Sequence, residues 1–285
     1  MQKSFILIIV LAVGTVIGLY SLPRTLVKNE KKTLDAPAAN RDKGMKQQTV
    51  AGNEKNEQME EHNKPLSVAQ QQKIDALKAD LLKANTTQKL KVTDQLIQEF
   101  VKAMHYDSAA FYAENAAKTS PSEVNWYKAG SLYYEAYTFA SGTKVAKMGE
   151  KVRETYQKVL DINPNNLTAK TNMAMTFVAT QTPMQGILML REVIAQDPHN
   201  ELALYNLGQL SMQSGQFGKA AERFKQILNN NPNNEQAMFL LAASQAELGK
   251  KEEAKTLLNN LTKKSKNPQM LEAVQEMLAK LNTSK

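Results

Sequence analysis

Three prolines stand 34 residues apart in this chain: Pro164, Pro198 and Pro232, in the similar contexts INPNN, QDPHN and NNPNN. Proline cannot continue a helix, so each of them predicts the end of one. A catalytic motif has no reason to recur at a fixed interval, whereas a stacked structural unit does. Periods of about 20 to 50 residues are typical of repeat proteins, in which each unit buries its apolar face against its neighbours. The spacing therefore predicts a repeat protein.

The apolar residues from Ser67 onward recur with helical spacing, and no alternating strand pattern of useful length occurs. Ser67 is the expected N-cap of the first helix, because a serine side chain accepts a hydrogen bond from the free N–H groups of a first turn. The chain is therefore predicted to be all-α across residues 66–285, with helices over 67–84, 88–104 and 107–119 and a capping helix over about 269–282.

One unit of the repeat is defined most clearly when Glu201 is taken as its first residue. A first helix then places Leu204, Leu207, Gly208 and Ser211 on one side, and a second helix does the same with Ala220, Phe224 and Ile227. Gly215 falls at the turn between them. Small residues at Gly208 and Ala220 allow two helix backbones to approach closely, and Pro232 ends the unit.

This pattern resembles the tetratricopeptide repeat family, whose units contain L-G, A-x3-F and a closing proline. The resemblance implies a right-handed superhelix, or α-solenoid, of stacked helix pairs. In register, the units are 123–166, 167–200, 201–234 and 235–268. The unit 123–166 has about ten extra residues around TFASGTKVAK, which predict either a lengthened helix pair or a protruding loop.

The amino-terminal 65 residues have a different character. Residues 5–22, FILIIVLAVGTVIGLYSL, are uncharged and long enough to cross a bilayer as a helix. We expect a membrane anchor over residues 1–27, with a cleaved signal peptide as the alternative. Residues 28–65 are polar and predict a disordered linker. The body is expected in the periplasm, although the lysines after the span leave a cytoplasmic body as the alternative.

Several classes of function are disfavoured by composition. The chain has no cysteine and three histidines, His62, His105 and His199, without metal-ligand spacing. No metal or cofactor is therefore expected. The formal net charge of +8 is spread along the chain, so no nucleic-acid partner is predicted. His199 is expected in a turn, and Glu123 with Glu135 is a poor candidate for a catalytic pair.

The resemblance also implies where a partner binds, because first helices line the concave face of such a stack. We call the predicted partner-contacting residues the inner stripe: Tyr127, Ser131, Tyr134, Thr171, Asn172, Met175, Leu202, Tyr205, Asn206, Gln209, Met212 and Phe239. Aromatic, Met and amide side chains suit a protein or peptide ligand. Asn172 and Asn206 resemble the asparagine rows with which some members hold peptide backbones. Lys128 is the only basic residue at these positions, which disfavours the carboxylate clamp of cytoplasmic co-chaperones.

The predicted function is thus a non-catalytic, membrane-tethered scaffold for protein partners. Anchored proteins that resemble this one suggest roles in envelope biogenesis, protein translocation or cytochrome maturation. A periplasmic chaperone that binds unfolded or secretory polypeptides is the alternative. An enzyme is disfavoured, because nucleophile, metal and phosphate-loop signals are missing.

Overall fold

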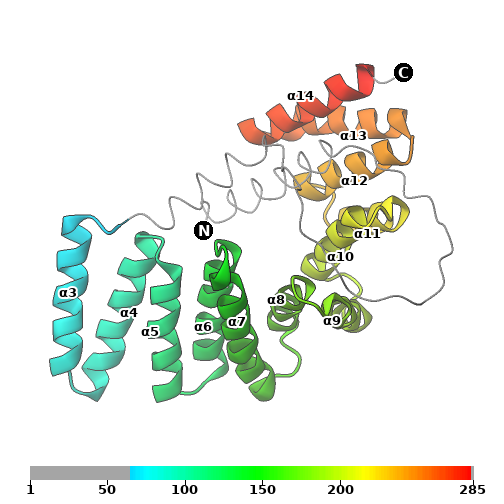
Figure 1. The fold of residues 1–285 in the computed structure, drawn as a ribbon. Coiled ribbons are helices and arrows are strands. Elements are labelled where there is room, and N and C mark those ends of the chain that lie inside the picture. The colour runs from blue at the N-terminus through cyan, green and yellow to red at the C-terminus, as the bar shows by residue number, and fades with distance from the viewer. Residues whose placement is uncertain (1–64, 284–285) are drawn as a thin grey trace, which may run out of the picture. The chain divides into compact units, whose positions relative to one another are not determined.

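The computed structural model describes residues 65–283, which form twelve α-helices and no strand (Figure 1). The all-α prediction is confirmed for this part of the chain. The helices are α3 (Val68–Lys83), α4 (Thr86–Lys102), α5 (Tyr106–Thr119), α6 (Glu123–Thr138), α7 (Thr143–Ile162), α8 (Leu167–Val178), α9 (Pro183–Gln196), α10 (Glu201–Gln213), α11 (Phe217–Asn230), α12 (Glu235–Glu247), α13 (Lys251–Lys264) and α14 (Pro268–Thr283).

The predicted membrane anchor at residues 5–22 and the predicted linker up to residue 64 lie outside the described residues. Within residues 65–283, no helix combines the length and the apolar character needed to cross a bilayer.

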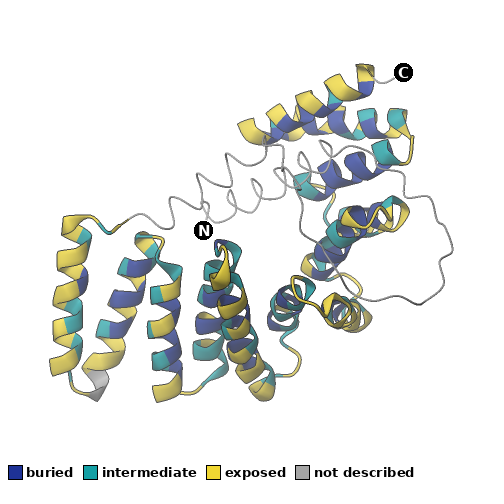
Figure 2. Cartoon of the chain, viewed as in Figure 1, coloured by how far each residue is buried: buried dark blue, intermediate teal, exposed yellow. Residues whose placement is uncertain are grey.

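Helices pack in the order in which they occur along the chain. Each helix from α3 to α14 makes its main contacts with the preceding and following helices, and α8 also touches α6 and α10. Buried residues lie on the sides that face neighbouring helices, while the opposite sides are exposed (Figure 2). This arrangement is a linear stack, in which every helix pair depends on the adjacent pairs to cover its apolar face.

The three turns with the proline period share one capping arrangement. Asn166, Asn200 and Asn234 accept hydrogen bonds from the backbone N–H three residues later, at 2.9, 3.1 and 2.9 Å, and so cap α8, α10 and α12. The preceding helices α7, α9 and α11 each end two residues before a proline. Proline and asparagine therefore act together: the first ends one helix, and the second begins the next.

Other turns and helix starts also follow local sequence signals. Ser67 caps α3 in a capping box with Gln70, as predicted. Gly215, between α10 and α11, has a φ of 71°, which favours glycine. Pro268 does not close the unit before it. It is the first residue of α14, a position where its missing N–H costs nothing.

The ten extra residues of the unit 123–166 are taken up by longer helices. Helices α6 and α7 have 16 and 20 residues, compared with 13 and 14 in α10 and α11. Of the two predicted alternatives, the lengthened helix pair is therefore correct, and the extra turns make α7 the longest helix between residues 65 and 283.

Close packing within the pairs α6–α7 and α10–α11 depends on glycine opposite an aromatic ring. A Cβ atom on Gly208 would lie 2.6 Å from the Phe224 ring, and one on Gly130 would lie 2.8 Å from the Tyr156 ring. Both rings are fully buried. Since real Cβ contacts are never this short, only glycine allows the first helix to lie against the ring of the second.

Candidate partner-binding site

The inner stripe comes from the first helices α6, α8, α10 and α12, which the period of the repeat places at equivalent positions. Seven of its residues are half-buried: Tyr127, Ser131, Tyr134, Asn172, Met175, Tyr205 and Gln209. Leu202 is exposed, with 40% of its surface accessible. Thr171, Asn206, Met212 and Phe239 are buried. The stripe is thus mostly half-buried, and two of its side chains, Tyr205 and Gln209, are hydrogen-bonded to each other.

A tyrosine hydroxyl joins three helices at the first junction of the stripe. The Tyr156 hydroxyl of α7 lies 3.3 Å from Ser131 Oγ of α6 and accepts a hydrogen bond from Asn172 Nδ2 of α8 at 3.0 Å. Its ring also packs against Tyr127, with centroids 5.8 Å apart. Burial raises the pKa of the Tyr156 hydroxyl to about 12, so it stays protonated at neutral pH.

A second tyrosine hydroxyl joins α10 to α12. Tyr205 accepts hydrogen bonds from Gln209 Nε2 at 2.8 Å and from Gln236 Nε2 at 2.7 Å. Burial raises the pKa of Tyr205 as well. A phenol oxygen that accepts two hydrogen bonds still has its own hydrogen, and this hydrogen remains available as a donor.

The stripe also contains polar groups without a partner in residues 65–283. Thr171 Oγ1 is fully buried and makes no hydrogen bond there. Asn206 is 7% exposed, and its amide makes none within the same range. Buried polar groups are normally hydrogen-bonded, because leaving one unpaired costs about 1 to 3 kcal/mol. Thr171 Oγ1 is out of reach of a ligand because it is fully buried, so Asn206 is the one of the two that a bound backbone can contact.

Few charged side chains lie along the α6 end of the stripe. Lys128, its one basic neighbour, forms an ion pair with Asp94 of α4 at 2.7 Å. Glu135 on α6 is half-buried, and burial raises its pKa. The α6 end of the stripe thus has no free cation to grip a carboxylate.

Glu123 has a structural role that the sequence analysis missed. Its carboxylate accepts hydrogen bonds from Asn163 and Asn166 at 2.8 and 2.9 Å, and so ties the start of α6 to the turn before α8. These bonds lower the pKa of Glu123, since they favour its charged form.

The same link recurs in the unit 201–234, two units later. Glu201 accepts from Asn231 and Asn234 at 3.5 and 3.1 Å. The spacing of these asparagines from the glutamate that opens the unit is a signal that the sequence analysis could have used. His199 lies in a turn, as predicted, with its Nδ1 atom 2.7 Å from Asn230 Nδ2.

The comparisons with known proteins agree with this geometry. The tetratricopeptide repeat family model matches residues 185–230 and 211–281. No curated protein matches the sequence. Among solved structures, a tetratricopeptide repeat protein from Parabacteroides merdae ATCC 43184 is similar over 73% of this chain and 78% of its own, with 16% identity and a TM-score of 0.55.

PilW, described as a type IV pilus biogenesis factor, is similar over 70% of this chain and 91% of its own, with 20% identity and a TM-score of 0.49. At 16% identity the Parabacteroides merdae structure shows the fold alone, and the family model covers the carboxyl-terminal repeats. Residues 185–281 of this chain therefore match the tetratricopeptide repeat model, and they continue an all-helical stack within residues 65–283.

Proposed function

We propose that this chain is a non-catalytic scaffold that binds a partner polypeptide along the inner stripe. The observation that carries the proposal is the pair of tyrosine–amide networks around Tyr156 and Tyr205, each of which bridges neighbouring repeats. Side chains that are already fixed lose little freedom on binding, so such a surface is preorganised for a ligand.

The chemistry of the stripe suits an extended peptide. The Tyr205 hydroxyl has a hydrogen left to donate, and the Asn206 amide has both donors and an acceptor to offer. An extended backbone presents alternating N–H and C=O groups that match these partners. Leu202, one helical turn before Tyr205, and the half-buried Met175 of α8 offer apolar contact to side chains of the ligand.

Photo-crosslinking in the native cell tests this proposal most directly. A benzophenone amino acid is placed at Leu202 or Gln209 of the full-length chain, and at the exposed Lys225 of α11 as a matched control. We expect one discrete adduct from the two inner positions and none from Lys225. In the Gln209 probe, adding Tyr205→Phe should lower the yield of that adduct. Equal adducts from all three positions would contradict the proposal.

A chaperone that binds unfolded polypeptides is the alternative, and the same experiment separates the two. A chaperone gives a broad distribution of adducts from Leu202, because it contacts many sequences, and it suppresses the aggregation of a denatured test protein. A dedicated scaffold gives one adduct and little suppression.

The proposal includes attachment to a membrane through residues 5–22, with the body on the outer side. The support is the uncharged run FILIIVLAVGTVIGLYSL followed by the polar linker 28–65. Work beside an envelope-biogenesis, translocation or cytochrome-maturation complex fits such a tethered scaffold. Reporters fused after Lys285, one active only outside and one only inside the cytoplasm, test the side. Activity of the cytoplasmic reporter alone would refute this orientation.

A further inference from the structure

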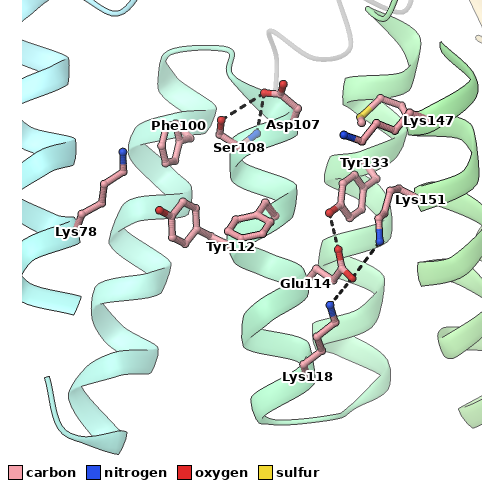
Figure 3. A pocket seen from close by; sticks show the side chains of 12 residues that line it. Lys78, Phe100, Asp107, Ser108, Tyr112, Glu114, Lys118, Tyr133, Lys147 and Lys151 are labelled. Carbon is pink, nitrogen blue, oxygen red and sulfur yellow. Dashed lines mark hydrogen bonds and ion pairs between the residues drawn. The ribbon is translucent and has the colours of Figure 1, made fainter. Parts of the chain in front are cut away.

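A pocket of about 540 Å³ lies between α3, α4, α5, α6 and α7 (Figure 3). None of the residues that line it belongs to the inner stripe. Lys78 of α3 stands at one side of the pocket and Lys147 of α7 at the other, with aromatic side chains between them. The pocket is thus a second surface with its own chemistry, and it does not depend on the proposed function of the stripe.

The floor of the pocket is aromatic. The Phe100 and Tyr112 rings stack with centroids 5.6 Å apart, and Phe111 packs edge-on against Tyr112 at 5.4 Å. Phe111 is 53% exposed, although it is a large apolar side chain. Lys78 Nζ lies 5.9 Å from the centre of the Phe100 ring, a cation–π contact that holds this ammonium over the floor.

The charge of the lining is positive, since four lysines face two carboxylates. Glu114 is the buried carboxylate, and it is already fully engaged: Lys118 lies 2.7 Å away, Lys151 lies 3.5 Å away, and the Tyr133 hydroxyl donates to it at 2.5 Å. Burial raises the pKa of Glu114, but these three partners outweigh burial and leave the pKa below its usual range. Glu114 therefore stays ionised and compensates Lys118 and Lys151.

The remaining charges are Lys78, Lys147 and Asp107. Asp107 lies in the first turn of α5 and accepts a hydrogen bond from the Ser108 N–H at 2.7 Å, a place where the helix dipole partly offsets a negative charge. Lys78 has one weak ion pair, with Asp75 at 3.9 Å. Lys147 is exposed and has no ion pair within residues 65–283. Two available cations thus stand on either side of an exposed aromatic floor.

We propose that this pocket binds an acidic peptide segment of a partner protein, with a large apolar side chain between acidic residues. The apolar side chain covers Phe111 and the Phe100–Tyr112 stack, and the flanking carboxylates pair with Lys78 and Lys147. Charge complementarity selects this occupant, because a neutral or basic segment leaves Lys147 without an ion pair and Lys78 with only its weak pair to Asp75. A volume of about 540 Å³ accommodates a few side chains of a peptide.

Calorimetric titration of the full-length chain in detergent with three synthetic nonapeptides tests the inference. The first peptide has the centre Glu-Glu-Phe-Glu-Glu, the second replaces every Glu with Gln, and the third replaces Phe with Ser. We expect the first to bind at least about tenfold more tightly than either other peptide, because each of those lacks one half of the recognition. Its affinity should also fall as salt is raised.

Charge reversal identifies the site. Lys78→Glu combined with Lys147→Glu should weaken binding of the first peptide about tenfold, since two attractions become repulsions. The control is Lys225→Glu with Lys266→Glu, which makes the same change in net charge on two exposed lysines far along the chain and should leave the affinity unchanged. Phe111→Ala, at an exposed position that packing does not require, should weaken binding by about threefold.

Three results would overturn the inference: equal binding of the three peptides, no binding of the first, or equal loss in the pocket and control variants. Self-association of the chain that the Lys78→Glu and Lys147→Glu pair abolishes would also overturn it, because a second copy would then be the occupant. The crosslinks from Leu202 and Gln209 should be unchanged in the Lys78→Glu, Lys147→Glu variant. A failure of the pocket proposal is therefore distinguishable from a failure of the proposed function of the inner stripe.

Discussion

Two helix pairs, α6–α7 and α10–α11, place aromatic rings at equivalent positions but use hydroxyl groups differently. The rings are Tyr127 with Tyr156 in the first pair, 5.8 Å apart, and Tyr205 with Phe224 in the second, 6.3 Å apart. In α6–α7 the bridging hydroxyl is on the ring of the second helix, Tyr156, whereas in α10–α11 it is on the ring of the first helix, Tyr205.

The difference shows that packing within a helix pair requires the aromatic ring, whereas the hydrogen bonds to the next repeat require only the hydroxyl. The ring of the second helix is needed in both pairs, because it fills the space beside Gly130 or Gly208. The hydroxyl is not tied to that ring, since either helix can supply it to the neighbouring repeat. Helix packing therefore fixes the rings, and the side chains of the next repeat decide where a hydroxyl finds partners.

The buried polar contacts of the two pairs differ in the same way. Tyr133 of α6 donates to the buried carboxylate of Glu114, whereas the equivalent residue of α10, Ser211, accepts from Arg223 of α11 at 2.8 Å. Burial and the nearby Arg191 lower the pKa of Arg223. The first contact joins α6 to the preceding α5, and the second stays within its own pair.

Removing the ring is expected to have the largest effect. Phe224→Ala empties a fully buried site between α10 and α11, so the free energy of unfolding should fall by about 3 to 5 kcal/mol. Urea unfolding followed by circular dichroism measures the loss. A fall below 1 kcal/mol would mean that the ring is not the packing element that α6–α7 and α10–α11 share.

Adding a methyl group at a closely packed glycine should have the second largest effect on stability. In α9, a Cβ atom on Gly186 would lie 2.3 Å from the backbone oxygen of Ala174, and a backbone atom cannot rotate away as a side chain can. Gly186→Ala should therefore destabilise the chain by about 2 to 3 kcal/mol.

Gly218 of α11 provides the matched control for this substitution, since a Cβ atom there would meet nothing within 4 Å. Gly218→Ala should leave stability unchanged or raise it by up to about 1 kcal/mol, because alanine favours helix. Equal effects of the two substitutions would contradict the close approach of α8 and α9.

Exchanging the hydroxyl between the two pairs tests their difference directly. Asn172, which donates to the Tyr156 hydroxyl, comes from the unit that follows Tyr156, and Leu240 holds the same position in the unit that follows Phe224. Leu240 is 1% exposed and cannot form a hydrogen bond. Phe224→Tyr should therefore lower the free energy of unfolding by about 2 kcal/mol. Tyr156→Phe should cost about 1 kcal/mol, the net value of its hydrogen bonds. Denaturant unfolding of both variants measures the asymmetry, and a stabilised Phe224→Tyr variant would show that the partners were misassigned.

The sequence was sufficient for the parts of this fold that helix geometry determines. Gly208, Ala220, Phe224 and Pro232 have fixed places within a helix pair, so their spacing predicted the contacts that the structure contains. The inner stripe remains a prediction, because a helical position says which face a residue shares and not what its side chain contacts.

Hydrogen bonds between repeats could not be read in this way. The links from Asn172 to Tyr156 and from Gln236 to Tyr205 join side chains of neighbouring units, and they depend on how those units are rotated relative to each other. The pocket was missed for the same reason, since its lining residues come from five helices, α3 to α7. A single turn of sequence shows none of these contacts.

The smallest expected effect concerns Glu114, the buried carboxylate that distinguishes α6–α7 from α10–α11. Its pKa is lowered in the folded chain, so its stabilisation is complete above the ordinary glutamate pKa of about 4.3 and is lost as the pH falls through the lower folded value. Glu114→Gln keeps an oxygen that accepts from Tyr133, and Lys118 and Lys151 remain partly exposed to water. The variant should therefore be less stable by about 0.5 to 1 kcal/mol at pH 7, and the difference should shrink as the pH falls below the ordinary glutamate pKa and vanish once the native carboxyl is protonated in the folded chain. A difference that persists unchanged at low pH would mean that shape, and not charge, accounts for the effect of Glu114.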